Sequence, residues 1–356
     1  MIRRLPGGTS GKADRHRSRG SAHPRPARLN TVGNVLAAYA ARFSTDDPLS
    51  ALEIDDLAAP PSPDGWVTVT VRVAALNHHD IWSLRGVGLA EDQLPMILGC
   101  DAAGVDEEGN DVIVHAVIGD ADAGGGDETY DPKRSLLSEK YAGTIAERVR
   151  VPRRNLVPKP PELSFAEAAC LPTAWLTAYK MLFSRSGVRP GDTVLVQGAG
   201  GGVATAAIAL ARAAGLRVWA TSRSEDKRKR ALELGAHDVF DAGARLPARV
   251  DAVIDSVGEA TLDHSVKSCR PGGRVVLCGA TSGRAAQLEL ARVFFNQVDV
   301  LGSTMGSRRE LQSLVDFLGT TGVRPVIDSE FPIAEARDGF ARMLDGDVFG
   351  KVLFTV

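Results

Sequence analysis

The stretch from residue 193 to residue 223 constrains the fold of this 356-residue chain more than any other part. It opens with the apolar run 194–196, passes through a glycine cluster and a helix of small residues, and closes with a second apolar run at 216–221. Short apolar runs are typical of buried parallel strands, so the order predicts a β-α-β unit. Glycine lets the backbone bend sharply and lie close to a ligand, and the helix start offers free N–H groups to a phosphate. The stretch therefore predicts a dinucleotide-binding turn, against the alternative of a plain structural turn.

The residues after the second strand indicate which dinucleotide is bound. NAD sites usually place an acidic residue there, whereas this chain has Ser222 and Arg223, with Lys227 one helical turn later. A hydroxyl and two cations suit a 2′-phosphate, so the sequence predicts NADP(H) rather than NAD(H). The alternative is that the basic residues up to position 230 form only the solvated face of a helix.

Composition sets broad limits on partners and location. The length allows two domains, and the formal net charge of −2 gives no indication of a nucleic-acid or anionic-membrane partner. No apolar run approaches the roughly 20 residues that span a bilayer. The cysteines lack CxxC or disulfide-like spacing, which favours isolated thiols in a reducing cytoplasm. They are Cys100, Cys170, Cys269 and Cys278.

The N-terminal segment, residues 1–31, is basic and rich in glycine, proline and serine. Such a composition cannot bury enough apolar surface to offset the entropy of ordering, so we expect a disordered basic tail. Arginine and serine with few acids also resemble a transit peptide, but glycine and proline disfavour its amphipathic helix.

The first half of the chain has a strand pattern with turns. Residues 66–76 alternate apolar and polar side chains and predict an antiparallel strand, and 95–105 reads as a strand with glycines at the bends. Residues 119–141 predict a long loop. Ser164 and Glu167 have capping-box spacing before a helical stretch that we expect Pro172 to break.

The second half alternates strands and helices, which predicts a doubly wound sheet with right-handed crossovers. Buried strands are expected at 250–257, 273–279 and 298–302. Ligands bind beyond the carboxyl ends of such strands. The residues at those ends are Val257, Gly279, Ala280, Thr281, Ser303, Thr304 and Met305.

Several motifs in one order resemble the medium-chain dehydrogenase/reductase superfamily over about residues 35–356. Among them are NHHDIWSLRG, LPMILGCDAAGV, VQGAGGGVA and FGKVLFTV. The likeness is closest to the quinone oxidoreductase-like and zinc-type alcohol dehydrogenase-like branches. It implies an α/β fold: a Rossmann doubly wound parallel sheet plus a GroES-like, mainly β catalytic domain. The expected domains are 32–163 (GroES-like), 164–302 (Rossmann) and 303–356 (a return to the catalytic domain).

The resemblance also implies roles for single residues. Gly201, Gly202 and Val203, with Gly198 before them, match the pyrophosphate-binding turn, and Ser222, Arg223 and Lys227 match the 2′-phosphate subsite. Segments 279–281 and 303–305 flank the nicotinamide, and Asn77 and Thr177 match positions near its ring and ribose. Trp82 stands where quinone oxidoreductases often have a tyrosine. A homodimer is implied as well.

The resemblance places the catalytic zinc ligands of metal-dependent members at Asn77, Cys100 and Thr173. Only Cys100 is a good zinc ligand, whereas a catalytic zinc needs about three protein ligands. We therefore predict no metal. The alternative is a regrouped site that uses His78, His79, His115 and Asp80.

Without zinc to polarise an alcohol, reduction fits better than oxidation. We expect NADPH to give hydride to a small-molecule quinone or to the β-carbon of an α,β-unsaturated carbonyl. Asn77 would hydrogen-bond the acceptor oxygen and His79 or Asp80 would relay a proton, although Asp80 is alternatively a structural partner in its turn. Two other functions remain open: a zinc-type alcohol or carbonyl dehydrogenase, and a non-catalytic NADPH-binding sensor.

Overall fold

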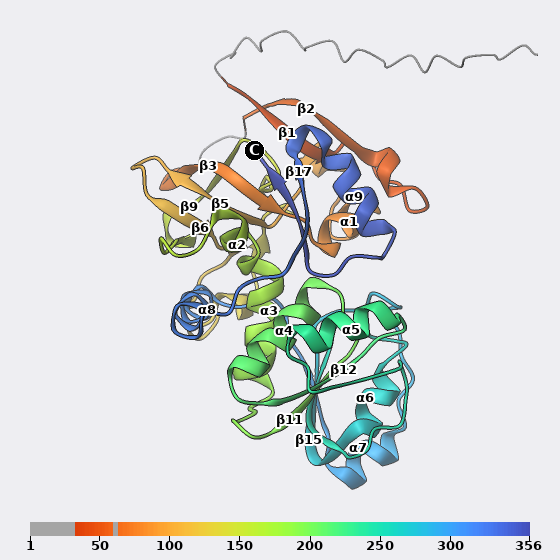
Figure 1. The fold of residues 1–356 in the computed structure, drawn as a ribbon. Helices are drawn as coiled ribbons and strands as arrows, with labels where there is room; N and C mark the ends of the chain where they lie inside the picture. The colour runs from red at the N-terminus through yellow and green to blue at the C-terminus, as the bar shows by residue number, and fades with distance from the viewer. Residues whose placement is uncertain (1–32, 60–62) are drawn as a thin grey trace, which may run out of the picture. The chain divides into compact units, whose positions relative to one another are not determined.

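The computed structural model describes residues 33–59 and 63–356. The tail predicted at 1–31 lies outside the described residues. The expected two-part α/β architecture is confirmed, with a parallel sheet and a mainly β part in the described chain (Figure 1).

The parallel sheet contains six strands in the order β13-β12-β11-β14-β15-β16. Its neighbouring strands all pair in parallel, as the buried apolar runs predicted. Reversal of the strand order beside β11 places the glycine turn at the switch point of the sheet, where ligands bind in such folds. The strands are β11 (Thr193–Val196), β12 (Arg217–Thr221), β13 (Asp238–Phe240), β14 (Val250–Asp255), β15 (Cys269–Leu277) and β16 (Asp299–Gly302). The helices of this part are α4 (Gly202–Ala213), α5 (Glu225–Leu234), α6 (Leu262–Ser268) and α7 (Leu290–Asn296).

The mainly β part is built on a seven-stranded sheet. Its order is β10-β6-β5-β3-β18-β17, with β9 also paired to β3. The last strand, β18, pairs antiparallel with β3, so the chain returns to this sheet after the parallel one. The strands are β3 (Trp66–Ala75), β5 (Asp101–Asp106), β6 (Asp111–Val114), β9 (Arg148–Pro152), β10 (Leu156–Pro158), β17 (Ile327–Pro332) and β18 (Lys351–Thr355). The boundaries at residues 163 and 302 stay predictions.

Smaller elements complete this part. A three-stranded sheet has the order β2-β1-β4, and β7 pairs with β8, which lies inside the stretch expected to be loop. These strands are β1 (Asn34–Ala40), β2 (Leu52–Ala58), β4 (Met96–Ile97), β7 (Val117–Ile118) and β8 (Ser135–Leu136). The helices are α1 (His78–Leu84), α8 (Arg308–Thr321) and α9 (Ala336–Leu344), with 3-10 turns at Pro48–Ala51, Glu91–Gln93, Glu128–Tyr130, Arg153–Asn155 and Ile333–Glu335.

The expected break at Pro172 is wrong. The capping box of Ser164 and Glu167 starts α2 (Phe165–Ala169), and the chain then stays helical through Pro172. A wider π-helical turn (Leu171–Trp175) accommodates the proline ring, followed by α3 (Leu176–Tyr179) and a second π-helical turn (Lys180–Arg185). Fully buried Leu171 and Trp175 hold this segment in the core.

The loop 119–141 is tied to the helical segment by a buried cation. Lys180 Nζ donates to Asp127 Oδ2 at 2.8 Å and to Thr129 Oγ1 at 2.7 Å, and the Lys180 side chain is 4 % exposed. This contact fixes a stretch that has no periodic pattern in the sequence. Glu139, near the end of the same loop, contacts His79 of α1.

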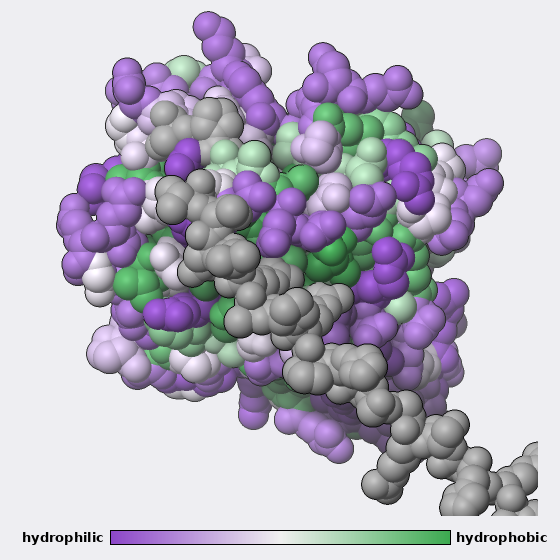
Figure 2. Space-filling view, turned by 90° about the horizontal axis from the view of Figure 1, so that it is seen from above, coloured by the Kyte–Doolittle hydropathy of each residue, from purple (hydrophilic) through white to green (hydrophobic). Residues whose placement is uncertain are grey.

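The surface gives no sign of a membrane span. Across the described residues, no helix combines the length and the apolar character that crossing a bilayer requires. On the face shown in Figure 2, hydrophilic residues are interspersed with smaller hydrophobic areas.

Candidate active site

The glycine turn after β11 leads into the start of α4. Gly198 and Gly200 have positive φ angles of 73° and 138°, a region that side chains other than glycine's rarely adopt. A Cβ on Gly198 would also lie 2.6 Å from Val257 Cγ2. Gly201 caps α4 without a side-chain hydrogen bond, and a Cβ there would meet nothing within 4 Å. The first amides of α4 therefore have no side-chain cap, an arrangement that fits a phosphate group.

The other predicted cofactor residues follow the strands as expected. Val257 follows β14, segment 279–281 follows β15 and segment 303–305 follows β16. Val203 lies in the first turn of α4, and Thr177 is buried on α3. The structure thus gathers the strand-end residues at one edge of the sheet.

The three residues predicted to bind a 2′-phosphate follow β12 but differ in their availability. Ser222 is buried, and its Oγ accepts from Ser224 N at 3.2 Å. Lys227 Nζ donates to Gly346 O at 2.7 Å. Arg223 is exposed and has no hydrogen bond or ion pair with any residue of the described chain. Arg223 is consequently the cation that is free to meet a ligand.

Asp80 is engaged by the backbone. Its Oδ2 accepts from Asn77 N at 2.9 Å at the start of α1, and its Oδ1 accepts from Gly99 N at 2.8 Å. The side chain is fully buried. This geometry assigns Asp80 to holding α1 in place, the structural alternative for this residue.

His79 faces a second carboxylate that the sequence did not indicate. Its Nε2 lies 3.1 Å from Glu139 Oε1, and its Nδ1 lies 3.6 Å from Cys100 Sγ. Burial lowers the pKa of His79, but Cys100, Asp80 and Glu139 outweigh burial and raise that pKa well above 6.5. Burial also raises the pKa of the Cys100 thiol. The raised pKa favours the protonated form of His79, which donates to the Glu139 carboxylate.

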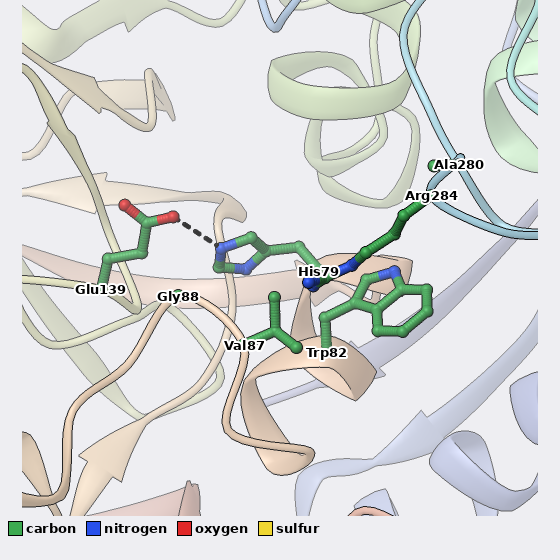
Figure 3. A pocket seen from close by; sticks show the side chains of 7 residues that line it. All are labelled: His79, Trp82, Val87, Gly88, Glu139, Ala280 and Arg284. Carbon is green, nitrogen blue, oxygen red and sulfur yellow. Dashed lines mark hydrogen bonds and ion pairs between the residues drawn. The ribbon is translucent and has the colours of Figure 1, made fainter. Parts of the chain in front are cut away.

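Two cavities border the His79–Glu139 pair. The first has a volume of about 250 Å³, and its wall includes His79 from α1 and Ala280 from the end of β15 (Figure 3). The second, of about 370 Å³, shares Glu139 and includes Thr304 and Met305. The first cavity is lined by His79, Trp82, Val87, Gly88, Glu139, Ala280 and Arg284. Residues of the mainly β part thus meet segments that follow the parallel strands around one acid–base pair.

Lys351 was missed in the sequence, although it lies in the FGKVLFTV motif. Its Nζ donates to Leu76 O at 2.8 Å, to Asn77 Oδ1 at 2.6 Å and to Asp101 Oδ2 at 3.1 Å. Asn77 Nδ2 donates in turn to Asp101 Oδ2 at 2.9 Å and to Ala75 O at 3.4 Å. Both ends of the Asn77 amide are therefore occupied, and only its long bond to Ala75 is weak enough to yield to an acceptor oxygen.

The same residues decide whether a catalytic zinc fits. Asn77 and Thr173 supply an amide and a hydroxyl, and the Cys100 thiol donates to Leu137 O at 3.2 Å. The ammonium of Lys351 already neutralises Asp101 and would repel a metal ion. Within the described ranges, no three His, Cys, Asp or Glu side chains are placed to hold a metal. By its chemistry, this donor set does not fit zinc.

Comparisons with known proteins agree with this architecture. Residues 63–161 match the "Alcohol dehydrogenase GroES-like domain" family and residues 202–320 match the "Zinc-binding dehydrogenase" family. An acryloyl-coenzyme A reductase of Metallosphaera sedula is 30% identical over 85% of this chain and 96% of its own length. The quinone oxidoreductase of Mus musculus is 26% identical over 82% of this chain and 89% of its own.

A solved structure extends the comparison to the fold. A crystal structure of an NAD-dependent alcohol dehydrogenase has 35% identity and a TM-score of 0.82, and the match covers 90% of this chain and 99% of that one. Fold, site and relatives together define an oxidoreductase with a GroES-like domain and a Rossmann domain. The chain belongs to the medium-chain dehydrogenase/reductase superfamily, as its motifs indicated.

Proposed function

We propose that this protein is a zinc-independent, NADPH-dependent reductase of α,β-unsaturated carbonyl compounds or quinones. The observation that carries the proposal is the shared cavity of His79 and Ala280. It joins a charged acid on one part of the fold to a strand end that the resemblance assigns to the nicotinamide. The acryloyl-coenzyme A reductase among the relatives supports an activated alkene as the acceptor, and the mouse quinone oxidoreductase supports a quinone.

The cofactor is held by two groups of residues. Gly198, Gly201 and the first amides of α4 bind the pyrophosphate, since that helix start lacks a side-chain cap and attracts anions. Arg223 binds the 2′-phosphate, with Ser222 and Lys227 beside it. When bound, the reduced nicotinamide supplies the hydride.

The remaining chemistry belongs to this chain's own side chains. The proton between His79 Nε2 and Glu139 Oε1 is delivered to the acceptor after hydride has reached the β-carbon. The carbon–carbon double bond becomes a single bond, and His79 regains its proton from solvent because its side chain is 23% exposed. Asn77, held by Lys351 and Asp101, orients the acceptor oxygen by exchanging its long bond to Ala75.

We also propose a homodimer formed through α7 and β16. β16 is the last strand of the parallel sheet in the described chain, so one of its edges lacks a partner there. Leu290, Phe294 and Phe295 of α7 are 70%, 61% and 79% exposed. Large apolar side chains beside a sheet edge favour burial against a second copy.

Deuterium transfer from 4-deuterated NADPH tests the proposed activity. With cinnamaldehyde as acceptor, we expect deuterium at the β-carbon of the saturated product, detected by mass spectrometry. His79→Asn and Glu139→Gln should slow the reaction without changing where deuterium appears. Deuterium at the carbonyl carbon, or no turnover of any enal or quinone while NADPH binds tightly, would contradict the proposal.

A further inference from the structure

Arg284 reaches into the cavity from the segment that follows β15. Figure 3 shows its side chain extending from the backbone beside Ala280 toward His79 and Trp82. In the described part of the chain, Arg284 makes no hydrogen bond and no ion pair. A guanidinium with no partner at the wall of a cavity of about 250 Å³ is available to a ligand.

Glu139 and Arg284 carry opposite charges at the wall of this cavity, but they do not pair with each other. Glu139 is the one carboxylate among its lining residues in the described chain, and it already pairs with His79 at 3.1 Å. Arg284 stands outside this pair, and it is exposed, so its guanidinium is open to a ligand from solvent. The nearby Glu259 carboxylate, which lies against Gly283, forms no ion pair with it within the described residues. A cation at the wall of such a cavity raises the local concentration of anions.

A second arginine contacts Trp82. The guanidinium carbon of Arg85 lies 5.4 Å from the ring centroid of Trp82. Its Nε is buried and has no hydrogen-bond partner in the described residues. Trp82 thus carries one cation over its ring and shares the cavity wall with another, which adds to the positive potential at this end of the cavity.

We propose that the acceptor carries an anionic oxygen group, a carboxylate or a phosphate, which Arg284 binds beside Trp82. This inference rests on the proposed function and names the substrate class of the same site. The planar fork of an arginine holds such a group by two parallel hydrogen bonds, which fixes orientation as well as position. With the anion held at Arg284, the reactive part of a small acceptor lies toward His79 and Glu139.

Two pairs of acceptors test the inference. Cinnamaldehyde and 4-carboxycinnamaldehyde share the reacting enal and differ by a carboxylate. Crotonyl-pantetheine and crotonyl-coenzyme A share the thioester and differ by the adenosine phosphates. Steady-state kcat/KM is measured for each with the full-length protein and NADPH.

Arg284→Gln should lower kcat/KM for the anionic member of a pair by about 10- to 100-fold and leave the neutral member within about twofold. Arg284→Lys should give an intermediate loss, because it keeps the charge without the fork. Arg309→Gln is the matched control, since Arg309 is exposed on α8 and lines neither cavity. The preference of the unmodified protein for the anionic member should shrink as salt concentration rises.

The outcomes separate the inference from the proposed function. A lower kcat/KM of Arg284→Gln for the anionic member of either pair supports the inference. The pair in which this loss occurs identifies the source of the anion. Equal use of both members, unchanged by Arg284→Gln, overturns the inference while the proposed function stands. A change in KM for NADPH instead of the acceptor assigns Arg284 to the cofactor and also overturns it. No turnover of any of the four acceptors, or of a quinone assayed beside them, overturns both.

Discussion

Replacing Lys351 with methionine should destabilise the protein strongly. Methionine keeps most of the stem but removes the ammonium that donates to Leu76 O, Asn77 and Asp101. The Lys351 and Asp101 side chains are 3% and 0% exposed, so the variant leaves a carboxylate buried without its cation. Breaking a buried pair in this way costs about 3–5 kcal/mol of the free energy of unfolding.

The stability deficit of Lys351→Met should also change with pH, which tests the same reasoning independently. Burial raises the pKa of Asp101 above 3.8, and Lys351 opposes that rise, so the pKa of Asp101 rises further in Lys351→Met. A carboxyl with a raised folded-state pKa contributes stability that is present below 3.8 and is lost as pH rises through the folded value. The deficit of the variant should therefore grow between pH 4 and pH 8.

Guanidinium unfolding at several pH values, followed by tryptophan fluorescence and circular dichroism, measures these differences. Asp101→Asn added to Lys351→Met should recover part of the loss, because no buried charge remains. Lys267→Met is the control: its pair with Asp263 is 48% and 51% exposed, and exposed pairs contribute about 0–1 kcal/mol. A deficit for Lys351→Met as small as the control's, or one that is flat with pH, would refute the reasoning.

Four further predictions concern catalysis, cofactor choice, assembly and the glycine turn. The pKa of His79 is raised well above 6.5, so kcat/KM for an enal should stay level through neutral pH and fall at higher pH. His79→Asn should remove this fall and lower the plateau of kcat/KM about 100-fold. A fall that persists in the variant argues for another acid. Arg223→Asp should raise the KM for NADPH far more than the KM for NADH, and an unchanged preference would refute the 2′-phosphate assignment. Phe295→Asp should convert the dimer to a monomer in light scattering, whereas an unaltered mass places the interface elsewhere. Gly198→Ala should weaken NADPH binding, since its φ of 73° and its approach to Val257 leave no room for a Cβ, and equal affinity by calorimetry would show that the turn adapts.

The fold was predictable where side-chain patterns are periodic. An apolar run indicates a strand buried on both faces, and the alternation at 66–76 indicates a strand buried on one face. The strands β11, β14 and β3 were therefore expected near their observed bounds. Strands β2 and β17 were missed, because charged residues interrupt their alternation at the edges of sheets. The π-helical turn at Pro172 was missed because packing of Trp175 overrides the local preference of proline.

The site was predictable only in part. Residues that follow strands, such as Ala280, could be placed because parallel strands end at one edge of a sheet. Glu139 and Arg284 could not be placed from the sequence, since each lies in a segment without a periodic hydrophobic pattern. Each meets His79 or its cavity only through the tertiary structure. Lys351 was hidden for a related reason: its partner Asp101 is 250 positions away along the chain.

In the proposed reaction, hydride reaches an activated acceptor without help from a bound metal. The most direct measurement combines metal analysis of the purified protein with NADPH-dependent enal reduction before and after exhaustive chelation. We expect substoichiometric zinc and an unchanged rate of enal reduction in chelator. The reason is that Asn77, Thr173 and Lys351 surround Asp101 where a metal would need ligands. One zinc per chain, with activity that chelation abolishes and added zinc restores, would contradict it.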